Sequence, residues 1–568
     1  MLQKKWLLKD FDKECVVDIS KKLRISPITS IILYNRGIRD EEAIKEFLNS
    51  DLNSLHDPYL LKDMDKAVER IKLAKEKGEK ITIYGDYDVD GITSIAVLYK
   101  QLSLLGFEVD YYVPDRMQEG YGVNKEALDK IKVRGTGLII TVDTGITAVE
   151  ETEYARELGM DIIITDHHEC KESIPGAYAA IDPKRKDCSY PFKNLAGVGV
   201  AFKLIQALDE NSDIGALTEK YADLVCLGTV ADISPLVDEN RILVKEGLKR
   251  FEETKNIGLK ALIDVSTNNS KAITTSTIGY VIAPRINASG RLGCASRSVE
   301  MFLTDDKDKA YELANDLCKE NTIRQQTEQQ MFKEALDYIE AHPEMKDDRV
   351  LVIPHENWHH GIVGIVSSKI TEKFYKPSIL FAIDGEEAKG SGRSISGYNL
   401  FEALESSTDL LVKFGGHELA AGLSIKSDKI DEFRERINSY VPEKISKECM
   451  IPTVLIDAVI KVAYINLDTV DDINRLQPFG VENPTPVFAV KNIKIHRISV
   501  MSEGRHLRMT LYKDGKFLDA VGFGMGEYYN CLKEEDFIDA AFGIDINDYK
   551  GFQNVQLILK DIKLTEVN

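Results

Sequence analysis

Carboxylate and imidazole side chains suited to binding a metal ion gather in four short motifs of the first half of the sequence. These are Asp86, Asp88 and Asp90 in DYDVDG, Asp143 in VDTG, Asp166, His167 and His168 in TDHH, and Asp232 in GTVADI. Carboxylates this dense repel one another unless a cation neutralises them. Oxygen ligands with one or two imidazoles suit Mn²⁺ or Mg²⁺ better than a metal that prefers thiolates.

The carboxylates are numerous enough for two ions, and we expect Asp143 to bridge them. A two-ion site activates water and stabilises both oxygens of an in-line displacement at phosphorus. The sequence holds neither a Ser–His–Asp arrangement nor a P-loop motif to compete with this chemistry. A structural interpretation stays open for each residue, since an Asp after a strand is often a helix N-cap. The pattern favours metal-dependent hydrolysis of a phosphoester or phosphoanhydride.

The segments around these motifs alternate between strand and helix patterns from about residue 65 to residue 235. Predicted strands cover residues 80–86, 108–115, 137–143, 161–168 and 178–182, and amphipathic helices lie between them, for example over 64–77 and 146–159. Apolar strands separated by helices indicate a parallel sheet covered on both faces. Ligands of such sheets bind at the carboxyl ends of the strands, where we expect all four motifs to lie.

Later segments predict further domains. Residues 296–342 form one long helical pattern, residues 349–440 return to an α/β pattern, and about five strands after residue 450 suggest a small β-barrel, an OB-fold. The predicted organisation is an N-terminal helical appendage (1–60), a catalytic α/β domain (61–295), a connecting helix region (296–345), a smaller α/β domain (346–445) and a nucleic-acid-binding barrel (446–568).

The bulk composition is typical of a globular protein with several cores. The chain has 568 residues, 43% hydrophobic and 29% charged, and no apolar run approaches the roughly 20 residues of a membrane span. Its eight cysteines form no CxxC pair, which favours reduced thiols over a zinc site or a disulfide framework. The charged N-terminus is unlike a signal peptide. We therefore expect a cytoplasmic protein with no membrane partner.

Net charge, at −20, argues against nucleic acid as a partner when taken alone. Residues 491–516 are an exception, with seven basic residues against two acidic ones: Lys491, Lys494, Arg497, Arg505, Arg508, Lys513 and Lys516 against Glu503 and Asp514. Phe488, Tyr512 and Phe517 are nearby aromatic residues able to stack on bases. A local basic face on an acidic body is compatible with a single-stranded nucleic acid.

In combination and in this order, DYDVDG, VDTG, DHH and GTVADI resemble the four motifs of the DHH phosphoesterase superfamily. SGRS (391–394) and FGGHELAAG (414–422) resemble its DHHA1 subdomain, whose GGH segment faces the metal site in that superfamily. ASGRLG (288–293) and LQPFGVENPTPVF (476–488) extend the resemblance to the superfamily's bacterial exonucleases for single strands. An EF-hand loop is excluded, because Val97 stands where the twelfth-position Glu is required.

The resemblance implies roles for particular residues. Asp88, Asp90, Asp143, His167 and Asp232 would bind the metal ions, with Asp86 close by, and His168 would face the scissile phosphate. Substrate contacts would come from Arg116, Tyr121, Asn287, Ser289, Arg291, Ser391, Arg393 and His417. Arginine suits this role because its planar guanidinium binds phosphate through two donors.

The resemblance also implies an activity: 5′-to-3′ hydrolysis of single-stranded DNA in recombination and repair, by a monomer that acts with a RecQ-type helicase and a single-strand-binding protein. Two alternatives stay open, a phosphodiesterase for oligonucleotides or cyclic dinucleotides and a non-catalytic replication scaffold. The scaffold relatives have lost metal ligands, whereas all the ligand positions are present here. A pyrophosphatase of the superfamily would begin its first motif with a histidine, which this chain lacks.

Overall fold

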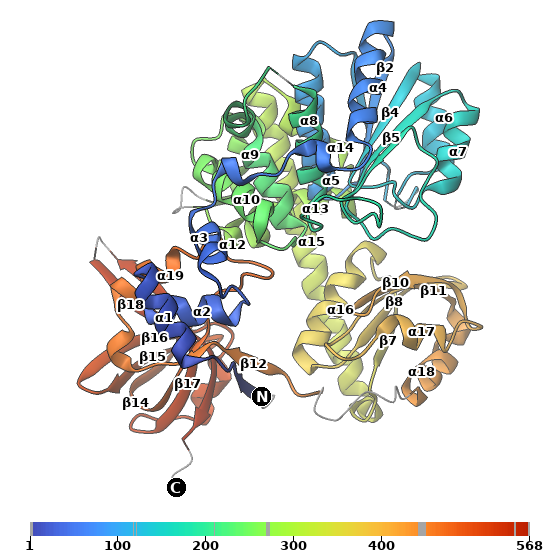
Figure 1. Ribbon diagram of the computed structural model, residues 1–568. Coiled ribbons are helices and arrows are strands. Elements are labelled where there is room, and N and C mark those ends of the chain that lie inside the picture. Colours follow the sequence, from blue (N-terminus) through green and yellow to red (C-terminus); the bar gives the residue numbers. More distant parts are fainter. Residues whose placement is uncertain are drawn as a thin grey trace. The chain divides into compact units, whose positions relative to one another are not determined.

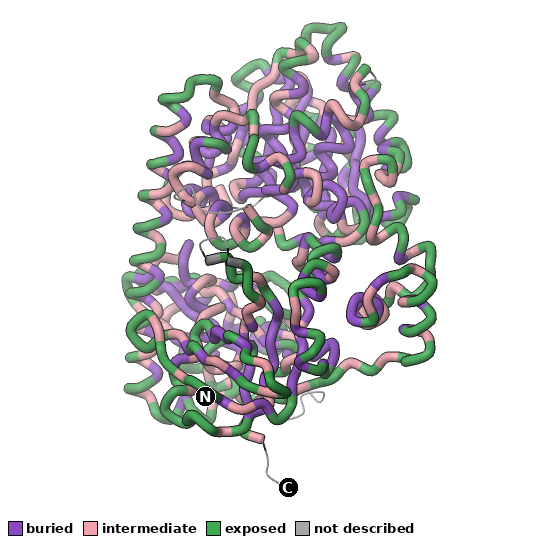
Figure 2. The backbone as a smooth tube through the Cα atoms, turned by 90° about the vertical axis from the view of Figure 1, so that its left-hand side faces the viewer, coloured by how far each residue is buried: buried purple, intermediate pink, exposed green. Residues whose placement is uncertain are grey.

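The structure is a computed structural model that describes residues 4–116, 119–120, 122–209, 211–267, 273–440, 450–549 and 552–565. The chain divides into two compact units. The catalytic unit comprises Lys45–Arg324 and Gln477–Pro484, and the accessory unit comprises Met1–Ile44, Gln325–Leu476 and Thr485–Asn568. Buried residues gather inside each unit, and exposed residues follow the outer turns of the helices (Figure 2).

A five-stranded parallel sheet with the order β3-β2-β4-β5-β6 forms the framework of the catalytic unit. Its strands are β2 (Lys80–Gly85), β3 (Val109–Tyr112), β4 (Thr136–Val142), β5 (Asp161–Thr165) and β6 (Ala179–Ile181). Each lies within a predicted strand or differs from it by one residue at the ends. Continuous runs of Ile and Val predicted these strands well because helices bury both faces of the sheet.

Helices cover the two faces of this sheet with separate cores (Figure 1). On one face Ile81, Ile83 and Ile140 pack with residues of α4 (Met64–Lys77), α5 (Val89–Leu104) and α8 (Gly197–Leu208). On the other face Tyr84, Ile139 and Ile162 pack with residues of α6 (Lys125–Val133) and α7 (Val149–Glu157). The arrangement leaves the carboxyl ends of the strands and the loops after them to form the site.

The rest of the catalytic unit is helical: α9 (Ile214–Ala231), α10 (Asp238–Phe251), α11 (Ile257–Thr267), α12 (Thr275–Thr277), the π-helix η3 (Ile278–Ile282), α13 (Ala283–Leu292) and α14 (Ser296–Leu303), with the short 3₁₀ turns η1 (Leu52–Ser54) and η2 (Pro58–Leu60) before the sheet.

A buried ion pair joins α8 to α10. The Lys203 ammonium lies 2.6 Å from a carboxylate oxygen of Glu239, and both side chains are fully buried. The Tyr190 hydroxyl donates to the other oxygen of Glu239 at 2.5 Å.

Helix α15 (Lys307–Ala341) runs from the catalytic unit into the accessory unit and confirms the long connecting helix. A second sheet follows, with the order β10-β11-β9-β8-β7 and only the β7–β8 pair parallel. Its strands are β7 (Leu351–Glu356), β8 (Ser378–Asp384), β9 (Glu387–Arg393), β10 (Leu411–Gly416) and β11 (Ala420–Lys426). The helices of this domain are α16 (His360–Phe374), α17 (Leu400–Glu405) and α18 (Ile430–Ser439), after the 3₁₀ turn η4 (Pro343–Lys346).

The C-terminal strands close into a five-stranded barrel, as the OB-fold prediction requires. They are β14 (Phe488–Met501), β15 (His506–Lys513), β16 (Lys516–Gly522), β17 (Phe537–Tyr549) and β18 (Phe552–Leu564). The pairing of β14 with β17 closes the ring β14-β15-β16-β18-β17. The short strand β13 (Ala458–Val459) adds to β14, and α19 (Leu467–Asn474) precedes the barrel.

The N-terminal segment contains a strand that the sequence analysis did not predict. Besides α1 (Lys13–Leu23), α2 (Pro27–Asn35) and α3 (Glu41–Asn49), it forms β1 (Lys5–Leu8), parallel to β12 (Thr453–Ile456). The Trp6 indole donates to Asp561 of the barrel at 2.6 Å. A four-residue strand whose partner lies at the opposite end of the chain leaves no local pattern to detect. The boundaries between the five predicted domains stay predictions.

Candidate metal centre and substrate surfaces

The first motif lies in the turn between β2 and α5. Asp88 is the N-cap of α5, where one oxygen of its carboxylate accepts the backbone N–H of Asp90 at 2.9 Å and that of Gly91 at 3.1 Å. At Gly91 a Cβ atom would lie 2.5 Å from the carbonyl oxygen of Asp86, so a side chain here would open the turn. Capping and cation binding are compatible for Asp88, because a carboxylate has further acceptor positions.

Asp90 stands in the first turn of α5 and is held rigidly by the N-terminus of α8. Its two carboxylate oxygens accept the N–H groups of Gly197 at 2.7 Å and Val198 at 2.9 Å. A Cβ atom at Gly197 would lie 2.6 Å from a carboxylate oxygen of Asp143. Gly197 is not among the predicted site residues, and its only local signal is the glycine spacing in LAGVGVAF.

Asp143 and His167 follow the neighbouring strands β4 and β5. Asp143 adopts a left-handed backbone conformation with φ of 58°. The Nε2 atom of His167 lies 3.0 Å from a carboxylate oxygen of Asp143 and 3.8 Å from one of Asp90. Residues that follow β2, β4 and β5 therefore lie together at the carboxyl ends of these strands, as we expected for a parallel sheet.

Asp232 reaches the same place from a different element, which corrects the expectation that it follows a strand. It is the residue after α9, and the Ser234 hydroxyl donates to its carboxylate at 2.5 Å. The apolar run before Asp232 is a buried helix rather than a strand, a distinction that short apolar runs leave open.

Ligand-type atoms of these residues form three groups, within each of which they lie no more than 4.8 Å apart: Asp86, Asp88 and Asp143; Asp90, His167 and Asp232; and Asp143, His167 and His168. Burial raises the pKa of Asp86 to about 8, with the charge of Asp88 adding to the effect. Burial and then the neighbouring carboxylates raise the pKa of Asp90 and Asp143 well above the usual range. The folded protein thus brings together carboxylates that hold protons more tightly than usual, and a bound cation would replace those protons.

Three buried atoms of this cluster make no hydrogen bond: a carboxylate oxygen of Asp86, one of Asp143, and Nε2 of His167. Such atoms are rare in a native interior because an unsatisfied polar group costs about 1–3 kcal/mol. Burial also lowers the pKa of His167, which favours the neutral imidazole that metals bind. These residues fit one or more hard divalent cations.

His168 differs from His167 in its surroundings. Its Nδ1 atom lies 2.7 Å from a carboxylate oxygen of Asp166, which also accepts the N–H of His167. Burial lowers the pKa of His168, but the hydrogen bond and charge of Asp166 outweigh burial and raise the pKa to about 9. At neutral pH His168 therefore carries a proton, which suits it to donate to an anion.

Asp182, at the end of β6, is a further buried acid that the sequence analysis did not assign to the site. Burial and then the charge of Asp166 raise its pKa to about 7, and one of its carboxylate oxygens makes no hydrogen bond. Its signal was available, because it is the last residue of a predicted strand of the same sheet, 178–182.

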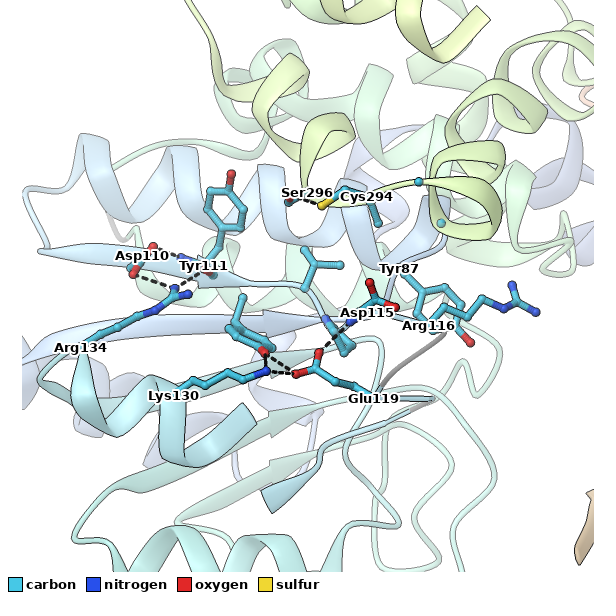
Figure 3. A pocket seen from close by; sticks show the side chains of 16 residues that line it. Tyr87, Asp110, Tyr111, Asp115, Arg116, Glu119, Lys130, Arg134, Cys294 and Ser296 are labelled. Atoms are coloured by element: carbon cyan, nitrogen blue, oxygen red, sulfur yellow. Dashed lines mark hydrogen bonds and ion pairs between the residues drawn. The ribbon is translucent and has the colours of Figure 1, made fainter. Parts of the chain in front are cut away.

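A polar pocket of about 450 Å³ adjoins the first motif (Figure 3). Tyr87, Arg116, Cys294 and Ser296 line it, and the Arg116 guanidinium lies 5.0 Å from the centre of the Tyr87 ring. On the opposite wall Lys130 donates to Glu119 at 2.6 Å. The structure thus brings the predicted substrate residue Arg116 beside the carboxylate cluster, since Tyr87 stands between Asp86 and Asp88.

The predicted substrate residues of α13 divide into two kinds. Asn287 and Arg291 are partly exposed. Ser289 is fully buried, and its hydroxyl bonds to the carbonyl of Ile286 and to Ser298, so we withdraw it as a substrate contact. Tyr121 lies outside the residues that the structure describes.

In the accessory unit Ser391 and Arg393 share β9. The Arg393 guanidinium donates to the Ser391 hydroxyl at 3.1 Å, and a Cβ atom at Gly364 of α16 would contact both side chains. His417 is exposed in the turn between β10 and β11, and its backbone N–H donates to Ala420. The roles of these three residues stay predictions.

Aromatic and basic residues meet on one side of the barrel. Phe517 is 57% exposed, and its ring centre lies 4.8 Å from that of Tyr512 and 4.9 Å from that of His496. Arg497 and Arg508 are exposed on the adjoining strands. Phe488 is fully buried in the barrel, so the expectation that it offers a stacking surface is wrong. Most strand aromatics belong to a core, and sequence alone does not separate the two kinds.

Known proteins align with nearly the whole length of this chain. The models "DHH family, N-terminal domain", "DHHA1 domain" and "RecJ OB domain" match residues 80–229, 347–443 and 456–561. The single-stranded-DNA-specific exonuclease RecJ of Bacillus subtilis is 40% identical, an alignment that covers 99% of this chain and 71% of the relative. RecJ of Escherichia coli is 35% identical over 95% and 96% of the two chains. The chain belongs to the RecJ family.

The crystal structure of Thermus thermophilus RecJ in complex with Mn²⁺ superimposes on this RecJ family member with a TM-score of 0.84, at 28% identity, over 99% of this chain and 80% of that one. A structure of the same relative in complex with Mg²⁺ has a TM-score of 0.79 at 27% identity. The predicted fold, with parallel-sheet DHH, DHHA1 and OB domains, is confirmed. Among the described residues no helix has the length and apolarity needed to cross a membrane.

Proposed function

We propose that this chain is a metal-dependent exonuclease that hydrolyses phosphodiester bonds of single-stranded DNA from the 5′ end. The observation that carries the proposal is the buried cluster of Asp86, Asp88, Asp90, Asp143, His167 and Asp232, in which three ligand-type atoms make no hydrogen bond and fit a cation. Two relatives that are 40% and 35% identical to this chain, aligned over 71% and 96% of their own lengths, are named single-stranded-DNA-specific exonucleases. The OB domain supports a single strand as the substrate.

Two ions, Mn²⁺ or Mg²⁺, fit the arrangement of ligand atoms. Asp86 and Asp88 would hold one ion, Asp90, His167 and Asp232 the other, and Asp143 would bridge them, since it lies within reach of both sets. When bound, the ions would polarise the scissile phosphate and lower the pKa of the attacking water.

The protein's own residues supply position and a proton. Asp90 is fixed by two backbone N–H groups of α8, so its carboxylate keeps one orientation. Asp166 keeps His168 protonated, and His168 then donates to an oxygen of the phosphate. Arg116, held against Tyr87, neutralises a phosphate of the incoming strand.

The decisive experiment uses single-stranded DNA labelled separately at its 5′ and 3′ ends, with Mn²⁺. We expect mononucleotides from the 5′ label at once and gradual shortening of the 3′-labelled strand. Asp143→Asn is the control variant, and we expect it to fold and to lose metal-dependent turnover. Release from the 3′ label would contradict the polarity.

The same experiment tests the alternatives. Hydrolysis confined to dinucleotides would favour a small-oligonucleotide phosphodiesterase, and absence of any hydrolysis would favour a scaffold. The intact ligand set argues against the scaffold. The monomeric state, the cytoplasmic location and the partners, a RecQ-type helicase and a single-strand-binding protein, stay predictions.

A further inference from the structure

Helix α9 ends in a Schellman motif whose left-handed residue is Ile233. The N–H of Ile233 donates to the carbonyl of Val230, and the N–H of Ser234 donates to that of Thr229, both at 3.3 Å. Ile233 has a φ of 63°. Glycine normally occupies this position because its missing Cβ removes the steric cost of the left-handed conformation.

Isoleucine is an unfavourable choice here. Among the described non-glycine residues with positive φ, Ile233 is the one β-branched residue. Left-handed backbone is strained at such a residue, because the branched Cβ crowds the neighbouring carbonyl groups. Packing does not recover this cost, because 70% of the Ile233 side chain is exposed. Folding alone would favour glycine or asparagine, so the side chain must serve something outside the fold.

The position of Ile233 in the chain indicates which role its side chain has outside the fold. Asp232, the preceding residue, contributes to the cluster with Asp90 and His167, and Ser234, the following residue, donates to the Asp232 carboxylate. Ile233 is therefore an exposed aliphatic residue adjacent in sequence to Asp232, one of the carboxylates that bind the metal in the proposed function. A nucleotide whose phosphate lies there presents its sugar and base to the surrounding surface.

We propose that Ile233 makes an apolar contact with the nucleoside of the nucleotide being cleaved. The proposal rests on the proposed function and adds a substrate-contacting residue to it. An aliphatic side chain has no hydrogen-bonding groups, so it accepts any base. This suits an enzyme that removes nucleotides regardless of sequence, in the way that stacking surfaces tolerate every base.

The test separates stability from substrate binding with Ile233→Gly. We expect the variant to unfold at the same or a higher temperature than the wild type, since the strain is relieved. We also expect its KM for oligodeoxythymidylate to rise about tenfold, as for an Ile side chain that loses an apolar contact. The kcat should stay within about twofold, because a contact present in both ground and transition states affects KM alone.

Two further variants sharpen the result. Ile233→Asn tolerates the left-handed conformation but is polar, so its KM should rise as well. Arg24→Gly is the matched control, since Arg24 follows α1 with a φ of 52° and is exposed. It should change stability in the same direction and leave KM unchanged.

A second measurement makes the inference independent of turnover: the Kd for oligodeoxythymidylate in EDTA, which should weaken in Ile233→Gly by a similar factor. A wild type without turnover would overturn the proposed function, while the Kd ratio would still decide the role of Ile233. Unchanged KM and Kd in Ile233→Gly would overturn the inference. So would a lower unfolding temperature or a fall in kcat alone, since these would show that Ile233 supports the fold or Asp232 instead.

Discussion

At the scale of single residues, burial and repulsion among the carboxylates of the site determine how its stability depends on pH. Burial raises the pKa of Asp86 from 3.8 to about 8, and Asp90 and Asp143 shift in the same direction. Between these pH values the folded chain holds protons that the unfolded chain has released. The contribution of these carboxylates to the stability of the metal-free protein is therefore largest at low pH and falls as pH rises, for Asp86 by about 1.4 kcal/mol per pH unit between its two pKa values.

Thermal unfolding in EDTA and in Mn²⁺ between pH 5 and about 8.5 measures this effect. We expect the unfolding temperature in EDTA to fall across that range and Mn²⁺ to remove most of the fall, since the cation replaces the protons. Asp143→Asn in EDTA should be more stable than the wild type at the alkaline end. Parallel curves with and without metal would show that the carboxylates do not bind the cation.

The dyad of Asp166 and His168 leads to a prediction about activity. Asp166 raises the pKa of His168 from 6.5 to about 9, so wild-type kcat should persist until pH approaches 9. In Asp166→Asn the imidazole loses its charged partner, and the alkaline limb of the pH–kcat profile should move down toward the ordinary histidine range. A general acid contributes about 10²–10⁴-fold, so His168→Gln should lower kcat by that order.

Profiles of kcat against pH for the two variants and the wild type measure both effects. Asp182→Glu is a suitable control, since this substitution keeps a carboxylate beside the dyad. An Asp166→Asn profile that coincides with the wild type would contradict the assignment of His168 as the proton donor.

At the scale of elements, the site depends on helix ends as much as on strand ends. Asp88 caps α5, the N-terminus of α8 holds Asp90, and the C-terminus of α9 presents Asp232. The packing of α8 therefore matters for the metal centre. The buried pair of Lys203 and Glu239 fixes α8 against α10, and burial lowers the pKa of Lys203.

Removing one partner of this pair should be severe. In Glu239→Leu the ammonium of Lys203 stays buried without its carboxylate, and we expect a loss of about 3–5 kcal/mol in the free energy of unfolding. Denaturant unfolding measures the change. The double variant Lys203→Met with Glu239→Leu should recover much of the loss, since both desolvated charges are then gone. Equal losses in the single and double variants would mean that the ion pair is not the cause.

At the scale of the whole molecule, the OB barrel is a second candidate surface for the single strand. Tyr512 and Phe517 form an exposed aromatic pair, and Arg497 and Arg508 are exposed on β14 and β15 of the same barrel. If bases stack there, Tyr512→Ala or Phe517→Ala should weaken binding by about 1–3 kcal/mol per lost stack. The loss should appear with long single strands and vanish with strands too short to span both barrel and metal centre.

Affinity for strands of increasing length, measured in EDTA to prevent cleavage, tests this prediction. Tyr529→Ala is the matched control, because Tyr529 is a 47% exposed tyrosine of the same domain outside the aromatic pair. A loss of affinity that is the same for all lengths would place the effect in the fold of the barrel rather than in a contact with the strand.

The local pattern of apolar residues in the sequence was enough to predict several helices and strands of this protein. Helix α4 matches its predicted span, and the parallel strands follow from their Ile and Val runs, because amphipathic periodicity and burial on both faces act over neighbouring residues. The motif residues also identify the chemistry, since carboxylates so dense require a cation whatever the surrounding fold. The same motif residues carry the resemblance to the DHH superfamily.

Tertiary structure alone decided the rest. Asp232 reaches the cluster from a helix, Gly197 approaches Asp143, β1 pairs with β12, and Ser289 and Phe488 are buried. Each of these facts depends on contact between residues far apart in the sequence, and local propensity carries no record of such contacts. The sequence by itself therefore determined which groups do the chemistry, and the fold decided which of them meet.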